Sequence, residues 1–579
     1  MIDEAHQHTI ATDLLLGFLK ELLAQRPDLK VVIMSATIDT DRFLEFFDGA
    51  KVEEVRGREF GVEINYLKEP TTNLVEDMVE TILQLHFRQQ SGDILVFASG
   101  KPQINAIMDG LRLRIHGDRQ NKPRFEQAQI GELSILELHA QMTAEEQTKV
   151  IDGVPPPHRG GKLSRRVIVA TNIAETALTV PGVTMVVDSG KVKIKSWNPE
   201  TETYSLREQG ISQSQAKQRA GRAGRVRPGE VWRMCTQNGF HAQLTEHAIP
   251  EMSQGDMIRE CLDILKMGRN PINFPYFTPP ATETIVKALG MLEALGAVAA
   301  NNNGLILTQR GQHMSRLPVN IFSAASLLAG PEFGCADEIL SLVSMIEATD
   351  GGQRLFCKPA DDQQKRDQWR IKDAFGREHG DHIMLFNIFV QWRHAEEGGG
   401  SEDFLKRKML LGDVLRDAQR TRLQLLRPLL DMGRESKEIW RPNSMLAGDP
   451  RYYVKIKAAL AAGHFLRVAR REGNDSGSDA PTYRTFRQNC RAILGKDTRL
   501  ANRTDDWVVY NECSVEGRQA TLRLVTPVPL RLLITAAPAY WAVPESAPRG
   551  HIRDELVQVL AEMSNMPATD IVSPMPPKP

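Results

Sequence analysis

Short, wholly apolar runs in the first third of the chain place the strongest constraint on its fold. They occur at residues 31–34 (VVIM), 94–97 (ILVF), 167–170 (VIVA) and 185–187 (MVV). A strand that is apolar at every position buries both of its faces, as strands do in a parallel sheet covered by helices. Between the first two runs, residues 73–89 place apolar side chains at helical spacing, at Leu74, Met78, Ile82 and Leu85. The pattern predicts right-handed βαβ units and a parallel sheet.

The pattern changes from about residue 240, where the chain becomes mainly helical. We expect a short amphipathic helix over residues 285–295 and a longer one, rich in Leu and Arg, over residues 404–430. Residues 505–541 return to β character, with apolar runs at 507–510, 520–525 and 530–535. Short strands of this kind are typical of a small barrel. Loops or irregular segments are expected at residues 155–161, 396–401, 472–481 and 574–579.

Composition indicates an ordinary globular chain, whose 579 residues suffice for several domains. Because the net charge is −1, any nucleic-acid surface must be a local groove lined by Lys and Arg. The six cysteines form no C-x-x-C pair, which argues against a zinc site or a disulfide framework and favours a reducing compartment. No apolar run reaches the ~18 residues that span a bilayer, and the first 30 residues are unlike a signal or transit peptide. We therefore expect an intracellular, soluble protein without a membrane segment.

Four short segments carry candidate chemistry: DEAH at residues 3–6, SAT at 35–37, ATNIAET at 170–176 and QRAGRAGR at 218–225. Taken alone, the first is more often an exposed acidic turn, and an ordinary N-capped strand–helix turn is a reasonable interpretation of the third. The fourth is harder to explain structurally. Arginines three residues apart with Gly and Ala between them make a poor core, but they can bring several guanidinium groups to one polyanion. A triphosphate is the obvious candidate, because bidentate Arg–phosphate hydrogen bonds are strong and directional.

The order and spacing of these segments resemble the DEAH-box (DEAH/RHA) family of superfamily 2 helicases. The similarity continues at residues 93–97 (motif IV strand), 188–209 (β-hairpin), 277–280 and 292–297 (winged-helix module), 333–339 and 380–382 (ratchet-like module) and 507–540 (oligonucleotide-binding, or OB, fold). The resemblance implies a multidomain α/β plus α protein with RecA-like parallel α/β motor domains. Its domains would be a partial first RecA-like domain (1–66), a second RecA-like domain (67–237), a winged helix (238–312), a helical ratchet (313–430), an OB fold (431–545) and a C-terminal tail (546–579).

The resemblance implies roles for the acidic segment. Asp3 would hold, through water, the Mg²⁺ that bridges the phosphates of ATP or another NTP, since Mg²⁺ prefers oxygen ligands and keeps part of its hydration shell. Glu4 would polarise the attacking water. His6 would link the nucleotide site to the second motor domain.

The other segments take further roles by the same resemblance. Gln218 would help to orient water, and Arg222 and Arg225 would act as arginine fingers on the γ-phosphate. The residues expected to touch RNA, or to couple hydrolysis to movement, are Ser35, Thr37, Thr171, Asn172 and Thr176.

The implied activity is NTP hydrolysis coupled to translocation along single-stranded RNA, unwinding or ribonucleoprotein remodelling. The NTP site would lie between two RecA-like domains, with the hairpin acting as a wedge or strand guide. We expect a monomer in the nucleus or cytoplasm, with the nucleus slightly favoured. An adaptor of the glycine-rich-patch type is a further expected partner.

The sequence departs from the family in one decisive respect. No G-x-x-x-x-G-K-[ST] string, the P-loop that cradles phosphates, occurs in the 579 residues; the nearest, GGKLS at residues 160–164, lies in a Pro-rich loop. We expect an amino-terminally shortened helicase whose residues 1–66 lack sheet neighbours and are poorly stable. Two smaller departures are Pro181, where many relatives carry an Asp, and the missing His-Pro-Ser stretch around residues 494–500.

Two classes of function therefore remain open. The family pattern favours an enzyme, whereas the missing P-loop favours, for this particular chain, a non-catalytic RNA- or partner-binding remnant that is inactive alone. DNA is a third possibility as the track, since contacts to the 2′-OH cannot be read from these residues. The pathway, the nucleotide preference and the direction of movement are likewise open.

Overall fold

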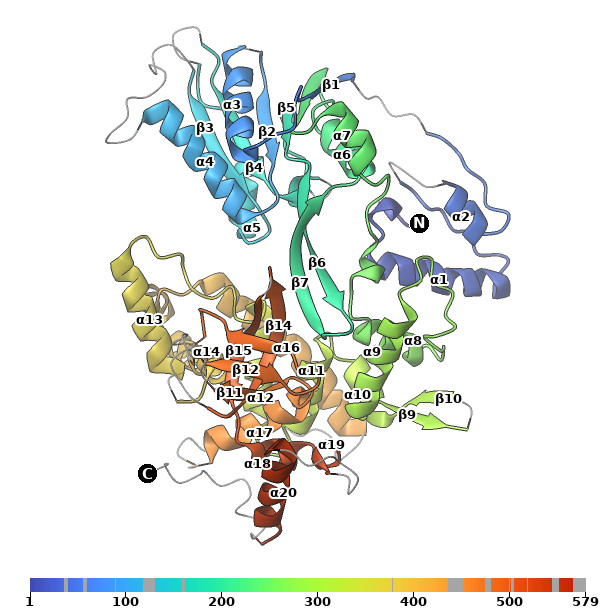
Figure 1. The fold of residues 1–579 in the computed structure, drawn as a ribbon, viewed down its shortest axis with the longest axis vertical. Helices are drawn as coiled ribbons and strands as arrows, with labels where there is room; N and C mark the ends of the chain where they lie inside the picture. The colour runs from blue at the N-terminus through green and yellow to red at the C-terminus, as the bar shows by residue number, and fades with distance from the viewer. Residues whose placement is uncertain are drawn as a thin grey trace. The chain divides into compact units, whose positions relative to one another are not determined.

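The computed structural model describes residues 1–565 with gaps. The gaps are residues 36–39, 56–59, 89, 118–130, 159–161, 176–177, 303, 377, 436–448, 450, 474–480, 499, 501–504, 518 and 544–550. The chain divides into two compact units, whose elements are labelled in Figure 1. The first unit comprises Met1–Leu15, Leu19–Lys195 and Leu206–Gln254, and the second comprises Leu16–Phe18, Ser196–Ser205 and Gly255–Pro579.

The first unit contains a six-stranded sheet in which every neighbouring pair of strands is parallel. In spatial order the strands are β1 (Val62–Tyr66), β8 (Gly229–Arg233), β5 (Val183–Asp188), β2 (Asp93–Phe97), β4 (Arg165–Ala170) and β3 (Leu133–Leu138). The predicted parallel sheet is confirmed, and three of the four apolar runs form its centre. Strand β1 also belongs to this sheet, although the sequence analysis counted its residues with 1–66.

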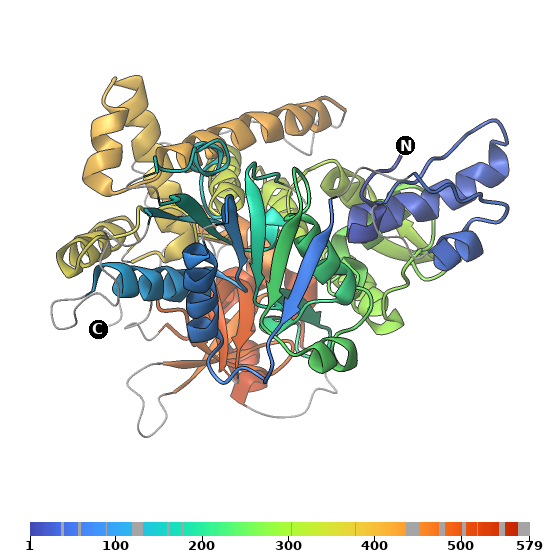
Figure 2. The ribbon, with the colours of Figure 1, turned by 90° about the horizontal axis from the view of Figure 1, so that it is seen from above.

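Helices cover both faces of this sheet (Figure 2). They are α3 (Leu74–Phe87), α4 (Lys101–His116), α5 (Ala144–Ile151) and α6 (Gln213–Gly221). Successive residues of β2 alternate between two cores: Ile94 and Val96 pack with α3 and α4, whereas Leu95 and Phe97 pack with residues of α5 and α6. Both faces are therefore buried, which is why the run is apolar at every position.

The strand expected at residues 31–34 does not form, and this prediction was wrong. Ile33 makes an isolated parallel bridge with Ile2, and Val32 is 48% exposed. A short run becomes a buried strand only when neighbouring strands cover its edges, and in the described part of residues 1–66 this segment pairs only with the stretch around Ile2. The remaining elements before β1 are helical: η1 (Ala5–Gln7), α1 (Ile10–Gln25) and α2 (Thr40–Phe46).

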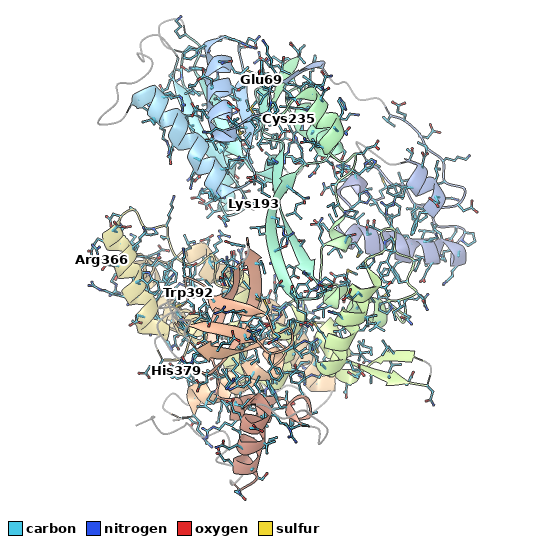
Figure 3. All side chains as sticks on the ribbon, viewed as in Figure 1. Glu69, Lys193, Cys235, Arg366, His379 and Trp392 are labelled. Atoms are coloured by element: carbon cyan, nitrogen blue, oxygen red, sulfur yellow. The ribbon has the colours of Figure 1, made fainter. Side chains whose placement is uncertain are left out.

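The predicted hairpin at residues 188–209 is confirmed as β6 (Lys191–Asn198) and β7 (Thr203–Gly210). Its base belongs to the first unit, where Ser99 Oγ donates a 2.5 Å hydrogen bond to Glu208 Oε2. Lys193 lies on β6 (Figure 3), and its aliphatic chain runs beside Gly100. The base of the hairpin is thus held at the carboxyl end of β2.

The tip of the hairpin belongs to the second unit. Glu202 accepts hydrogen bonds from Arg487 Nε at 3.0 Å and Nη2 at 2.8 Å. Tyr204 donates to Asp256 at 2.8 Å, and Lys287 donates to the Pro199 carbonyl at 2.7 Å. The tip is therefore tied to its surroundings by side chains from three different segments.

Helices dominate the second unit. Those that precede the barrel strands are α8 (Ile258–Lys266), α9 (Thr282–Ala294), α10 (Gln309–Ser315), α11 (Ile321–Ala329), α12 (Ala336–Ala348), α13 (Asp362–Gly376), α14 (Asp381–Glu397), α15 (Ser401–Lys408), α16 (Gly412–Glu435) and α17 (Tyr452–His464). A hairpin of β9 (Val298–Asn301) and β10 (Gly304–Leu307) lies between α9 and α10 in sequence. The helix expected at 285–295 is confirmed as α9.

The single long helix expected over residues 404–430 is wrong, because the chain forms α15 and α16 with a break at Met409. Met409 adopts a left-handed conformation (φ 54°). Leu410 bridges to Phe356, and the Leu411 N–H donates to the Leu355 carbonyl at 2.9 Å. The backbone groups that would continue the helix are used in this pairing, so the apolar periodicity continues while the helix does not.

A closed five-stranded barrel follows the helices. Its strands are β11 (Val468–Gly473), β12 (Thr482–Thr485), β13 (Arg491–Leu494), β14 (Trp507–Glu516) and β15 (Gln519–Pro527). They pair in the order β11-β12-β13-β15-β14, and β11 closes the ring by pairing with β14. The predicted small barrel is confirmed, but the strand expected at 530–535 is helix α18 (Leu530–Ala536). This short helix buries four apolar side chains, Leu530, Leu532, Leu533 and Ile534, so the apolar run alone does not distinguish a helix from a strand.

Asp381, at the start of α14, ties the helices to the barrel within the second unit. Its Oδ2 atom accepts hydrogen bonds from the Thr498 hydroxyl at 2.6 Å and from the Val525 N–H at 2.9 Å. The residue is 3% exposed. The preceding Gly380 has φ 92°, and a Cβ atom there would lie 2.7 Å from the Thr526 Cα atom. Only glycine suits this close approach.

We expect Asp381→Ala to lower the free energy of unfolding by roughly 2–4 kcal/mol, because two buried donors lose their acceptor. Asp381→Asn keeps one acceptor oxygen and should cost less. Asp362→Ala, whose side chain is 82% exposed on α13, should change stability by no more than about 0.5 kcal/mol. Urea unfolding of the purified chain checks this order, and equal effects of Asp381→Ala and Asp362→Ala would contradict it.

We also predict that the bridged segments at residues 1–5 and 31–34 exchange their amide hydrogens much faster than the sheet. Ile2 and Met34 donate to each other's segment at 2.8 Å in an isolated bridge, whereas Val96 and Val169 lie in the middle of fully buried strands. Local opening of a single bridge costs far less than opening a sheet core. Hydrogen-exchange mass spectrometry measures the difference; equal protection of the two regions would refute it.

Candidate functional site

The acidic segment at residues 3–6 forms a turn that is held by its own side chains. The Glu4 N–H donates to Asp3 Oδ1 at 2.9 Å, and Glu4 adopts a left-handed conformation (φ 53°). Asp3 and Glu4 are both exposed. A non-glycine residue in this region is uncommon and often belongs to a functional turn. Both carboxylates are therefore available to a ligand.

His6 connects this turn to the SAT segment. Its Nε2 atom lies 3.1 Å from Glu4 Oε2, and its Nδ1 atom lies 3.0 Å from Ser35 Oγ. Burial lowers the pKa of His6, although the nearby Glu4 charge opposes the shift. The structure thus brings Glu4, His6 and Ser35 into one hydrogen-bonded chain. Thr37 lies outside the described residues.

The arginine block at residues 218–225 covers the end of α6 and the turn after it. Its arginines have three different environments. Arg219 is fully buried, Arg222 is 8% exposed and Arg225 is exposed. Gln218, which precedes them, is half-buried. The exposure of the arginine side chains therefore increases along the block, from Arg219 to Arg225.

Arg219 lies between two buried carboxylates. Its Nε atom donates to Glu175 Oε2 at 2.9 Å, and its Nη1 atom donates to Asp188 Oδ1 at 2.8 Å. The guanidinium carbon lies 4.8 Å from the centre of the Phe97 ring. Burial alone would lower the pKa of Arg219, but the two carboxylates raise it, so the side chain stays charged. Sequence reasoning missed this residue, although its place in the arginine block was a usable signal.

Arg222 is held by backbone carbonyls rather than by acids. It donates to Leu178 O at 2.9 Å and to Glu175 O. Burial and the neighbouring charge of Arg225 lower the pKa of Arg222 to about 10, while Glu175 and Glu4 act to raise it. Arg225 contacts the Thr179 hydroxyl. Neither Arg222 nor Arg225 has a carboxylate as a hydrogen-bond partner among the described residues.

The segment at residues 170–176 continues from the carboxyl end of β4. Thr171 donates its N–H to Leu138 O at 3.1 Å, and the short helix η3 (Asn172–Ala174) follows. Asn172 is exposed. Glu175 joins this segment to Arg219, and Asp188 joins the end of β5 to the same arginine. Thr176 lies outside the described residues.

Two further residues at the same sheet edge were not predicted. The Lys101 Nζ atom, at the start of α4, lies 2.6 Å from His139 Nε2 and also contacts Glu137. Burial and the Lys101 charge lower the pKa of His139. Carboxyl ends of parallel strands are where α/β sheets bind ligands. Lys101 follows the apolar run at residues 94–97, which was a usable signal, whereas His139 follows β3, whose Ser134 and Glu137 interrupt the apolar pattern.

Comparison with family models gives two matches. Residues 77–227 match the helicase conserved C-terminal domain, and residues 323–385 match the ratchet-like helicase-associated domain (HA2). The combination of these two domains is characteristic of DEAH/RHA-type helicases. The chain belongs to the DEAH/RHA type of superfamily 2 helicases. Within this helicase the first match covers most of the parallel sheet together with α6, and the second covers α12 and α13.

Helicases of this type use an NTP with Mg²⁺. The described residues fit a Mg²⁺ ion that takes few ligands from the protein. No group of three or more His, Cys, Asp or Glu side chains gathers as a metal site among them. The exposed Asp3 carboxylate offers single oxygen ligands, which suits Mg²⁺ held mainly by phosphate oxygens and water. Among the described residues, no helix has the length and apolar character needed to cross a membrane.

We expect Arg219→Ala to destabilise the helicase by roughly 3–5 kcal/mol, because it leaves two buried carboxylates without their cation. Arg219→Lys should lose less, since one charge remains. Arg225→Ala removes an exposed arginine from the same block and should stay within about 0.5 kcal/mol. Guanidinium unfolding followed by tryptophan fluorescence tests this; equal midpoints for Arg219→Ala and Arg225→Ala would show that the buried pair is unimportant.

Proposed function

We propose that this DEAH/RHA-type helicase couples NTP hydrolysis to movement along single-stranded RNA. The observation that supports this most is the packing of the arginine block against residues 170–178. Arg219 binds the Glu175 carboxylate, and Arg222 binds the carbonyls of Glu175 and Leu178. A phosphate that draws Arg222 away from these carbonyls would therefore disturb the segment that carries Thr171 and Asn172.

The nucleotide side of the proposal assigns roles to exposed or half-buried groups. Arg222 and Arg225 would stabilise charge on the γ-phosphate, and Gln218 would help to orient water. Glu4 would act as the general base, held in its turn by the contact with His6. Asp3 would hold Mg²⁺ through water.

The RNA side of the proposal rests on the carboxyl edge of the sheet and on the second unit. Thr171 and Asn172 would contact the RNA backbone, and Ser35, with Thr37, would couple hydrolysis to movement. We assign α8, α9, the β9–β10 hairpin and α10 to a winged-helix module within residues 238–312. We assign the closed barrel, within residues 431–545, to an OB fold. Both modules would bind RNA or a glycine-rich-patch adaptor, and the protein would act as an intracellular monomer.

The decisive measurement is NTP hydrolysis by the purified chain, with and without single-stranded RNA. We expect RNA-stimulated turnover that Glu4→Gln lowers by roughly 10²–10⁴-fold, as for loss of a general base. Arg225→Ala should lower kcat by about 10³-fold or more, as for an arginine finger. Arg227→Ala is the matched control, because Arg227 is an equally exposed arginine that instead binds Ser91.

The same preparations should be tested for RNA binding by fluorescence anisotropy at two salt concentrations. Binding without turnover would contradict coupled hydrolysis in this chain and would identify a non-catalytic RNA-binding protein. Turnover that Glu4→Gln leaves unchanged would show that another residue activates the water. The G-x-x-x-x-G-K-[ST] string is not found in the 579 residues, so turnover would also show that other groups grip the triphosphate.

A further inference from the structure

A cavity of about 430 Å³ opens at the surface of the second unit, where α15 ends and α16 begins. Its lining residues come from α15, from the start of α16, and from α13 and the segment before it. None of them belongs to the candidate site described above. Ligand pockets usually have volumes of roughly 300–1,000 Å³. The cavity is therefore large enough to take an apolar side chain of a bound molecule.

The floor of the cavity is apolar. Leu405 and Leu410 are buried there, and Met409 and Cys357 are half-buried beside them. The Cys357 N–H donates to the Met409 carbonyl at 2.8 Å, so the pairing that interrupts the helix also holds the floor together. Methionine is flexible and polarizable, and it adapts to the shape of an apolar ligand. The floor thus suits a leucine or phenylalanine side chain.

The rim of the cavity is polar, and cations outnumber carboxylates on it. Lys406 and Arg416 are exposed there, and no carboxylate of the described residues forms an ion pair with Lys406. Glu402 also lies on the rim, but its Oε1 atom is 3.9 Å from Arg416 Nη1. This distance is too long for a hydrogen bond. Both cations are therefore available to a carboxylate from outside, which can bind a guanidinium through two parallel hydrogen bonds.

We propose that this cavity binds a short acidic segment of a partner protein. A leucine or phenylalanine of the segment packs against Leu405, Met409 and Leu410, and neighbouring carboxylates bind Lys406 and Arg416. This combination of an apolar anchor in a pocket with charged groups at its edge is typical of peptide recognition. The occupant differs in chemistry from the glycine-rich-patch adaptor proposed above.

The lining argues against RNA as the occupant, although RNA is also an anion. Leu405, Met409 and Leu410 offer no donor to a phosphate, and the Glu402 carboxylate on the rim repels one. None of the described residues that line the cavity is aromatic, so a base has no ring on which to stack. An acidic peptide uses both the floor and the rim, whereas a nucleic acid uses only the two cations.

The test measures peptide binding to the full chain by fluorescence anisotropy, without nucleotide. The probe is a fluorescein-labelled peptide of sequence EELFEE. Two comparison peptides are EESSEE, which lacks the apolar anchor, and KKLFKK, which reverses the charge. We expect a micromolar Kd for EELFEE. The two comparison peptides should bind at least about tenfold more weakly, because one loses the buried apolar area and the other is repelled by the rim.

Variants of the chain locate the bound peptide. Lys406→Glu and Arg416→Glu should each weaken binding of EELFEE by about tenfold. Arg407→Glu on α15 and Arg420→Glu on α16 are matched controls, because both arginines are exposed on the same helices and neither lines the cavity. Cys357→Phe should block the floor without changing the charge. Because the four charge reversals are at exposed positions, they keep the fold, and thermal unfolding checks this for every variant.

Three results would overturn the proposal. The first is equal binding of EELFEE and EESSEE, and the second is an equal loss of binding in Lys406→Glu and its control Arg407→Glu. The third is weaker binding of single-stranded RNA in Lys406→Glu and Arg416→Glu while peptide binding stays unchanged, which would identify the rim as an RNA contact. No outcome depends on hydrolysis, so failure here is separate from failure of the proposed helicase activity.

Discussion

The buried pairing of Arg219 with Glu175 and Asp188 is the interaction on which the first unit depends. Three segments that are far apart in sequence meet there: α6, the loop after β4 and the end of β5. Burying a charge is costly unless partners with good geometry compensate it. Here one cation faces two carboxylates, and Asp188 Oδ1 also accepts the Gly190 N–H at 2.9 Å. Each group therefore fixes the position of the others, and removing one leaves the rest uncompensated.

The three arginines of the block differ in the groups that hold them, and this difference bears on which of them could bind a ligand. Arg219 is held by two carboxylates, and a phosphate could displace it only by leaving both acids unpaired. Arg222 is held by neutral carbonyls and Arg225 by one hydroxyl. A phosphate oxygen is a much stronger acceptor for a guanidinium than a carbonyl is. The first arginine is thus suited to structure and the other two to a ligand, although the three are equivalent in the sequence pattern.

The sequence alone predicted what depends on local pattern and failed where distant partners decide. Residues 94–97 were correctly predicted as a strand, because burial on both faces leaves every position apolar. Residues 31–34 carry the same pattern, yet they form one bridge, because a strand needs neighbours that the run itself cannot specify. Leu410 interrupts the expected long helix by pairing with Phe356, and the run at 530–535 is helical. For the site, the family pattern predicted Asp3, Glu4 and Arg222, and their functional roles stay predictions. It did not predict the role of Arg219, since that role depends on Glu175 and Asp188, which only the folded sheet brings together.

The hairpin of β6 and β7 is divided between the two units, its base belonging to the first and its tip to the second. At its base, Arg219 Nη1 also approaches the Lys191 carbonyl at 3.4 Å, so the buried ion pair extends to the first residue of β6. At its tip, Glu202 and Tyr204 bind side chains of the second unit. The tip is thus fixed within the second unit by a bidentate ion pair and by the hydrogen bond of a half-buried tyrosine. If Arg222 binds a phosphate, as we propose, the resulting shift would reach Arg219, three residues earlier, and through it the Lys191 carbonyl at the start of β6.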